Sequence, residues 1–177
     1  MTVADFYTDF QFSLGEREKF DMYLLRKAIS KCIKVEKTTD ELDRKGIDYI
    51  ATLSGGALVY IDAKTRRRVR LVNGYPELAL EMWSVKPQNG NTGKIGWTLN
   101  TESNTDMILY TFPKDQWKYF YLIPFQFLRM AFQTHGKEWF KIYGSRVQEN
   151  GLWKSECMFV PANIVLDAVS EQMTGAA

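Results

Sequence analysis

The chain has 177 residues, of which 45% are apolar and 25% charged, so it can form one domain with a sizeable core and has neither a fibrous nor a disordered composition. Its net charge of +2 is too small to indicate a partner by itself. No apolar run approaches the roughly 20 residues that span a bilayer, and the first residues lack the layout of a signal peptide, so no membrane partner is expected.

One domain, residues 1–177, is predicted because no repeat, low-complexity tract or Pro/Gly/Ser-rich linker divides the chain. The two cysteines, Cys32 and Cys157, are far apart in the sequence and form no C-x-x-C pair. This usage is typical of reduced, buried thiols in a cytoplasmic protein.

The first predicted element is a helix that begins at the sequence SLGE, residues 13–16, which fits a capping box. Apolar residues recur at helical spacing from Met22 to Ile33. The helix is therefore expected to run to about Lys34 and to bury one apolar stripe.

Two strands, at about residues 47–53 and 57–65, are predicted on either side of Ser54-Gly55-Gly56. A third strand, at about 78–85, is expected to pair back through Asn73-Gly74, a typical two-residue hairpin turn.

The rest of the chain predicts more elements of both kinds. They are a hairpin of residues 106–112 and 118–123, helices at about 125–133 and 137–143, a hairpin around Asn150-Gly151, and a helix at about 162–172. Helices thus flank a cluster of strands, which indicates an α/β or α+β domain with a central mixed sheet.

The first hairpin contains three charged residues, Asp48, Asp62 and Lys64, where apolar residues could have stood. Strand residues two positions apart share a face, so Asp62 and Lys64 point the same way. If Ser54-Gly55-Gly56 is a three-residue loop, Asp48 lies directly opposite Asp62, with Cβ atoms roughly 5 Å apart. Two carboxylates this close repel unless a cation lies between them, and Mg²⁺ takes such oxygen ligands. A two-residue loop would instead place Asp48 on the other face.

The pairing of "GID" at residues 46–48 with "IDAK" at residues 61–64 resembles the PD-(D/E)xK nuclease superfamily, which includes restriction enzymes and phage and archaeal Holliday-junction resolvases. The resemblance covers roughly residues 16–112. It implies a restriction-endonuclease-like core, DNA as the partner, and Mg²⁺, replaceable by Mn²⁺, as the cofactor. It also implies that Asp48 and Asp62 bind the metal and act in catalysis with Lys64. The chain departs from the pattern in having isoleucine before Asp48 instead of proline, and aspartate at position 62 instead of the commoner glutamate.

In this superfamily the preceding helix often supplies another acid. Glu18 and Asp21 both lie along the apolar stripe of the first helix, at helical spacing from Leu25. Glu18 is predicted to be the additional catalytic acid. The alternative is that both residues are charges at the edge of the stripe that reach water.

Glu81 is a further candidate metal ligand. If Asn73-Gly74 forms a two-residue turn, Glu81 falls opposite Arg66 and on the same face as Asp62 and Lys64. An ordinary cross-strand ion pair with Arg66 is the alternative role for this carboxylate.

A run of basic residues follows Lys64 directly. In an extended chain Arg66, Arg68 and Arg70 would share one face, and arginine binds phosphate through two parallel hydrogen bonds. These three residues, with Lys94 in a later loop, are predicted to contact DNA. A solvated basic edge strand that resists aggregation is the alternative.

Together these features predict a metal-dependent DNA endonuclease of phage or mobile-element type, which hydrolyses a phosphodiester bond with a metal-activated water. It would act in the cytoplasm and could form a homodimer. The alternative function is that of a noncatalytic nucleic-acid-binding or interaction protein that keeps the sheet and uses these charges structurally.

Overall fold

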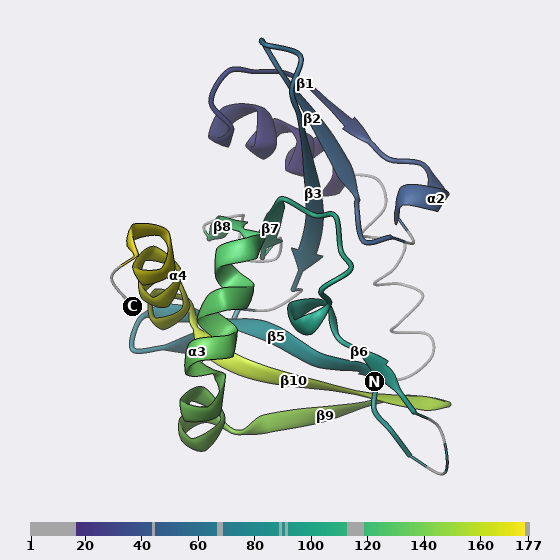
Figure 1. Cartoon of the computed structure of the whole chain (residues 1–177), viewed down its shortest axis with the longest axis vertical. Coiled ribbons are helices and arrows are strands. Elements are labelled where there is room, and N and C mark those ends of the chain that lie inside the picture. Colours follow the sequence, from purple (N-terminus) through teal and green to yellow (C-terminus); the bar gives the residue numbers. More distant parts are fainter. Residues whose placement is uncertain are drawn as a thin grey trace. The chain divides into compact units, whose positions relative to one another are not determined.

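A computed structural model of the protein describes residues 17–43, 45–66, 69–88, 90, 92–112 and 119–175. These residues form a mixed α/β structure in which two sheets replace the single central sheet that the sequence predicts (Figure 1). The chain divides into two compact units: unit 1 is Met1–Arg67 with Asn104–Leu122, and unit 2 is Arg68–Ser103 with Ile123–Ala177. The expectation of one domain over residues 1–177 stays a prediction.

Unit 1 begins with a helix whose described part covers residues 17–28. The predicted helix is too long, because Lys31 has a positive φ of 59° that breaks the helical path and strand β1, Cys32–Lys37, follows. The apolar spacing that suggested a longer helix continues into a strand that contains the β-branched residues Ile33 and Val35. The predicted capping box, residues 13–16, lies outside the described residues.

The hairpin of β2, Tyr49–Leu53, and β3, Leu58–Thr65, is confirmed. Leu53 N donates to Ala57 O at 2.9 Å, so the loop between these residues has three members. The last of them, Gly56, has φ of +81°, a conformation that glycine adopts without steric cost.

The sheet of unit 1 has the strand order β1-β2-β3-β7-β8. It includes β7, Met107–Thr111, which pairs with β3 in parallel, while β1, β2 and β3 pair antiparallel. The other described elements of the unit are the short helix α2, Asp40–Asp43, and most of β8, Phe120–Pro124. The core of the unit lies between the first helix and one face of this sheet, and consists of Leu25, Tyr49, Ala51, Ile61, Ala63 and Leu109.

The sheet of unit 2 has the strand order β4-β5-β10-β9, and β6 also pairs with β5. Its strands are β4 (Leu71–Val72), β5 (Tyr75–Val85), β6 (Lys94–Ile95), β9 (Ser145–Asn150) and β10 (Trp153–Pro161). Both predicted Asn-Gly turns are confirmed, since Val72 pairs with Tyr75 and Asn150 with Trp153.

The helices of unit 2 are the 3-10 turn η1, Trp97–Leu99, and the two α-helices α3, Phe125–Tyr143, and α4, Ala162–Thr174. Helices α3 and α4 pack on each other and on β10, as Figure 1 shows. The predicted break in α3 is wrong: Gly136 is buried inside one continuous helix, where packing outweighs its weak helix propensity. None of the helices in the described ranges is sufficiently long and apolar to cross a membrane.

Candidate active site

Asp48 lies directly before β2, in a segment that hydrogen bonds from neighbouring elements hold in place. The amide of Thr38 donates to Asp48 O at 2.9 Å, and the Thr38 hydroxyl donates to the same oxygen at 3.1 Å. The Asp48 amide donates to Ile61 O at 2.8 Å, and Thr105 Oγ1 donates to Gly46 O at 2.9 Å. These contacts fix the backbone on both sides of the Asp48 side chain.

The structure brings Asp48, Asp62 and Lys64 together. Lys64 Nζ lies 2.7 Å from Asp62 Oδ1, and the Ala63 amide donates to Asp48 Oδ2 at 2.6 Å. The pKa of Asp48 is raised, mainly by burial and also by the nearby Asp62 carboxylate. The hydrogen bond from the Ala63 N–H and the charge of Lys64 partly oppose this rise. The three-residue loop thus places two carboxylates and a lysine close together, as the strand pattern predicts.

Asp48 and Asp62 are the residues here that could hold a divalent cation. Asp48 and Asp62 are close enough for one charge to raise the pKa of the other carboxyl, and Mg²⁺ commonly uses only one or two protein carboxylates and keeps several waters. A third acid, Asp43 at the end of α2, lies near Asp48. Burial and the neighbouring Asp48 carboxyl raise the pKa of Asp43. In the described part of the chain, however, no three His, Cys, Asp or Glu side chains are already arranged to hold an ion.

The first helix lies on the opposite face of the sheet from Asp62 and Lys64. Ala63 packs in the core cluster together with Leu25 of the helix. Because alternate residues of a strand point to opposite faces, the two charged residues that flank Ala63 point away from the helix. The helix contacts the backbone next to the candidate site through Arg17, whose Nη2 donates to Ala63 O at 3.2 Å.

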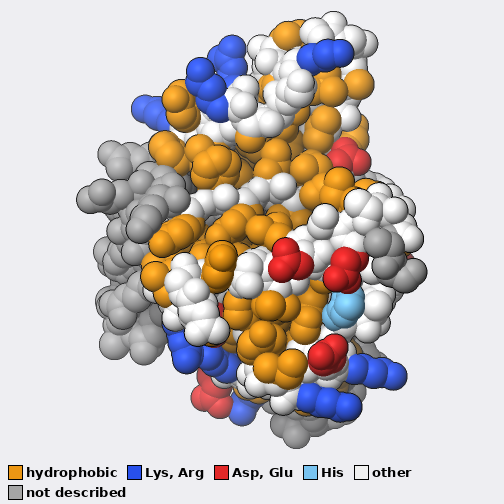
Figure 2. Space-filling view, turned by 90° about the vertical axis from the view of Figure 1, so that its left-hand side faces the viewer, with side chains coloured by type: hydrophobic (Ala, Val, Ile, Leu, Met, Phe, Trp, Pro, Cys, Tyr) orange, Lys and Arg blue, Asp and Glu red, His pale blue; other side chains and the backbone are white. Residues whose placement is uncertain are grey.

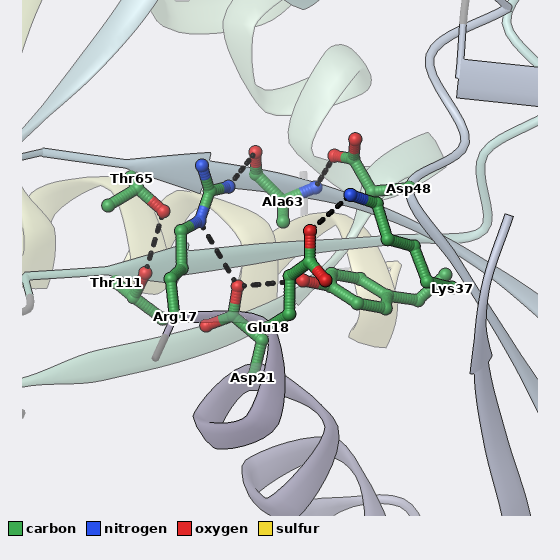
Figure 3. A network of polar contacts seen from close by, with 9 residues as sticks. Arg17, Glu18, Asp21, Lys37, Asp48, Ala63, Thr65 and Thr111 are labelled. Carbon is green, nitrogen blue, oxygen red and sulfur yellow. Dashed lines mark hydrogen bonds and ion pairs between the residues drawn. The ribbon is translucent and has the colours of Figure 1, made fainter. Parts of the chain in front are cut away.

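Asp21 is the buried acid of the first helix, and it lies beside Arg17 in the polar network of Figure 3. Its side chain is fully buried, and its Oδ2 accepts hydrogen bonds from Arg17 Nε and from the Tyr49 hydroxyl, both at 3.2 Å. Asp21 Oδ1 has no hydrogen-bond partner among the described residues. Burial, opposed by the Arg17 charge, raises the pKa of Asp21 to about 6, and the charge of Asp48 adds to the rise.

Arg17 links this buried acid to the candidate site. Its Nη2 donates to Ala63 O at 3.2 Å, while the Ala63 amide donates to Asp48 Oδ2, as Figure 3 shows. The peptide groups on both sides of Ala63 are therefore held by charged side chains. Burial and the adjacent Asp21 charge also raise the pKa of Tyr49, so its hydroxyl stays a hydrogen-bond donor at neutral pH.

Glu18, the acid that the sequence favoured, forms an ion pair with Lys37 of β1. Its role as a catalytic acid stays a prediction. The sequence does contain the signal for Asp21, which directly precedes Met22 and stands four positions before Leu25, in the middle of the buried stripe. A charged residue in the middle of a buried stripe is either paired or has a shifted pKa. Glu18, in contrast, lies at the edge of the apolar stripe of the helix.

Glu81 lies in unit 2, in β5. The prediction that it faces Arg66 is wrong, because β4 contains only Leu71–Val72 and Glu81 pairs across the sheet with Cys157. Its Oε2 accepts hydrogen bonds from Ser84 Oγ at 2.6 Å and from Trp97 N at 3.3 Å. These contacts give the carboxylate a role in holding the η1 turn against β5.

The basic residues after Lys64 do not form one continuous strand. Strand β3 ends at Thr65, and Arg68 lies outside the described residues. Arg66 stays in unit 1, where its amide donates to Thr111 O at 2.9 Å.

The other two predicted DNA contacts belong to unit 2. The exposed Arg70 has its Nε 3.7 Å from Glu77 Oε2. Lys94 lies in β6, pairs with Val85 and is exposed. The shared face of three arginines, which an extended chain predicts, is therefore not formed by one strand.

No family profile matches this chain, no curated protein matches its sequence significantly, and no solved structure matches it significantly.

Proposed function

We propose that this protein is a metal-dependent DNA endonuclease of the type that the PD-(D/E)xK pattern implies. The observation that supports the proposal best is the meeting of Asp48, Asp62 and Lys64 at the start of one strand and the end of the next. Nothing in hairpin stability alone favours two adjacent carboxylates, because like charges on opposed strands are destabilising.

In this proposal Asp48 and Asp62 hold the ion, which is Mg²⁺ or Mn²⁺. When bound, the ion supplies a nucleophile by lowering the pKa of a coordinated water and offsets charge on the phosphate. Lys64 stabilises the negative charge that develops on the phosphoryl oxygens, an effect that is large in a site with little water. Asp62 is nearly buried, and the side chain of Lys64 is only 27% exposed, so both work at reduced dielectric screening.

The positions of these groups depend on the Ala63 peptide. Its N–H orients the Asp48 carboxylate and its carbonyl is bound by Arg17, which Asp21 holds in turn. We therefore assign Arg17 and Asp21 as positioning residues, since they act on the candidate site through Ala63.

The experiment that tests the function uses purified protein and supercoiled plasmid with Mg²⁺, with Mn²⁺ or with EDTA. Cutting is expected with either metal and not with EDTA. If the protein binds DNA and cuts no plasmid, single-stranded or branched substrate with either metal, the noncatalytic nucleic-acid-binding function replaces the nuclease.

Metal binding should also stabilise the folded protein. Mg²⁺ binds the paired carboxylates of the native state and not the unfolded chain, so a concentration ten times the Kd adds about 1.4 kcal/mol and raises the melting temperature. Asp62→Asn is expected to abolish this increment in thermal denaturation followed by circular dichroism. Glu41→Gln, which removes an exposed carboxylate of the same unit, is expected to keep it. An equal increment in all three proteins would place the ion elsewhere.

A further inference from the structure

The outer face of the first helix carries a row of basic side chains. Lys19, Tyr23, Lys27 and Lys31 follow one another at intervals of four, and Arg26 lies beside them. All five residues are exposed, and we call them the basic ridge. Within the helix, residues 19, 23, 26 and 27 are spaced three or four apart and so lie on one face, and Lys31 follows three residues after the helix ends at residue 28.

The cations of the basic ridge differ from most other cations of unit 1. Lys34, Lys37, Lys45 and Lys64 each form an ion pair with a carboxylate. No ion pair joins the lysines and the arginine of the ridge to a carboxylate in the described part of the chain; instead Lys27 Nζ lies 5.9 Å from the centre of the Tyr23 ring. In the view of Figure 2, Lys and Arg side chains project from the surface at the top of the picture and others at the bottom.

The charge of the ridge is large relative to that of the protein. Its four cations carry +4, and the whole chain has a net charge of +2, so the rest of the molecule is on balance negative. A solvated helix face normally mixes both signs, because opposite charges four apart stabilise a helix and like charges destabilise it by about 0.2–0.5 kcal/mol. Arg26 and Lys27 lie in the last turn of the helix, where cations interact favourably with the helix dipole, so helix stability accounts for these two charges and not for Lys19, two turns earlier.

Lys31 has a backbone conformation that is unfavourable for lysine. Its φ of 59° lies in the left-handed region, where glycine or asparagine is favoured and another L-residue costs roughly 1 kcal/mol. The Lys31 carbonyl accepts a hydrogen bond from Ser54 N at 2.9 Å, and any residue could accept it. A lysine at this position thus provides a charge at some conformational cost.

We infer that the basic ridge binds the phosphodiester backbone of duplex DNA. The chemistry fits a phosphate backbone better than a lipid surface, because the apolar stripe of the helix is buried: Leu24 is 7% and Leu25 0% exposed. A helix that lies on a membrane inserts its apolar face. The ridge offers charges and one tyrosine, which suits a row of phosphates spaced along a strand.

The ridge also lies apart from the proposed cleavage site. It is on the outer side of the helix, and Asp62 and Lys64 point to the opposite face of the sheet. The part of the helix between residues 17 and 28 is about 16 Å long. DNA held by the ridge is bound by side chains other than those of the candidate site, so the ridge contributes affinity and the acids contribute chemistry. This division of roles rests on the proposed nuclease function, whereas binding by the ridge does not.

The test is fluorescence anisotropy with a labelled DNA duplex in EDTA, over about 50 to 200 mM salt. The ridge variant combines Lys19→Gln, Arg26→Gln, Lys27→Gln and Lys31→Gly. A control variant removes the same number of charges elsewhere with Lys45→Gln, Lys137→Gln, Lys141→Gln and Lys154→Gln, all at side chains that reach solvent.

The ridge variant is expected to bind at least about tenfold more weakly at the lowest salt, and each lost phosphate contact lowers the salt slope by about 0.9. The control variant is expected to stay close to the unmodified protein. Lys31→Gly alone should not lower the melting temperature, because glycine favours the positive φ. Circular dichroism checks that the other proteins are folded.

The inference would be overturned by no DNA binding by the unmodified protein, by no loss in the ridge variant, or by an equal loss in both variants, which would show a dependence on net charge alone. Binding to phosphatidylserine vesicles in place of DNA would also overturn it. EDTA prevents cleavage, so binding is measured separately from cutting. If the ridge binds DNA in EDTA but the protein cuts no DNA with Mg²⁺ or Mn²⁺, the nuclease proposal is refuted and the ridge inference stands. If the protein cuts DNA with metal but the ridge variant binds DNA as well as the unmodified protein, the ridge inference is refuted and the nuclease proposal stands.

Discussion

Lys64→Met and Asp62→Asn are each expected to slow Mg²⁺-dependent DNA cleavage by at least about a hundredfold. Lys64→Met removes the cation that lies 2.7 Å from Asp62 and that we assign to the charge on the phosphate; the loss of one such preorganised group typically costs a factor of about 10²–10³. Asp62→Asn replaces a metal ligand by a neutral amide, which weakens the hold on a hard cation.

The measurement is the single-turnover rate of plasmid cutting at saturating protein, because this rate is independent of DNA affinity. Lys45→Met is the matched control, since Lys45 is another lysine of unit 1 that pairs with a carboxylate and its side chain is 56% exposed. It should cut at the unmodified rate. Cutting that survives Asp62→Asn unchanged would exclude this site as the source of the activity.

Arg17→Met separates positioning from chemistry in the same assay. This substitution leaves Asp48, Asp62 and Lys64 in the chain but removes the hydrogen bond to Ala63 O and the partner of Asp21. A smaller loss of rate than for Lys64→Met is expected, and it should come with lower stability because Asp21 is fully buried.

The hairpins of this protein could be predicted from the sequence because their signals are local. Asn73-Gly74 and Asn150-Gly151 each fix a turn and a register within a few residues. The loop after Leu53 likewise fixes the parity of β3 relative to β2, and that parity brings Asp48 to Asp62. The core of the candidate site therefore follows from short-range information alone.

The partition into two sheets could not be predicted in the same way. The parallel pairing of β3 with β7 joins Ile61 to Met107 across more than forty residues, and no turn residue specifies such a contact. Strand β1 was missed for a related reason, since its pairing with β2 is a tertiary contact and overrides the helical spacing of its apolar residues. The turn at Asn73-Gly74 was predicted correctly, but the strand pairing on its two sides was expected to continue as far as Arg66 and Glu81. Strand β4 contains only two residues, so this pairing does not form.

The choice between Glu18 and Asp21 depended on burial, which the helical pattern gives only approximately. Both stand along the same stripe, but Asp21 is fully buried whereas the side chain of Glu18 is 28% exposed and bound to Lys37. What the sequence could not show is that the Tyr49 hydroxyl and Arg17 meet at Asp21. Those partners come from different elements.

Asp21 should make the stability of the protein depend on pH in a direction that is unusual for a carboxylate with a cationic partner. Its pKa in the folded protein is about 6, against 3.8 for an unperturbed aspartate, and burial is the main cause. Between these two values the folded state holds a proton that the unfolded state has lost. The stabilisation from protonated Asp21 is therefore complete below about pH 4 and is lost as the pH rises through about 6, and it amounts to about 3 kcal/mol.

Asp21→Asn removes this titration and keeps the shape of the side chain, so it isolates the contribution of Asp21 from those of Asp43 and Asp48, whose pKa values are also raised by burial. Relative to the unmodified protein, the variant is expected to gain up to about 3 kcal/mol of unfolding free energy between about pH 4 and pH 7.5. Urea denaturation at several pH values, in EDTA, measures this difference, and Glu41→Gln, at an exposed acid, should show no such change. Parallel curves for Asp21→Asn and the unmodified protein would mean that Asp21 is ionised throughout this range. In that case its paired oxygen, held by Arg17 and Tyr49, would be enough to offset the burial of the charge.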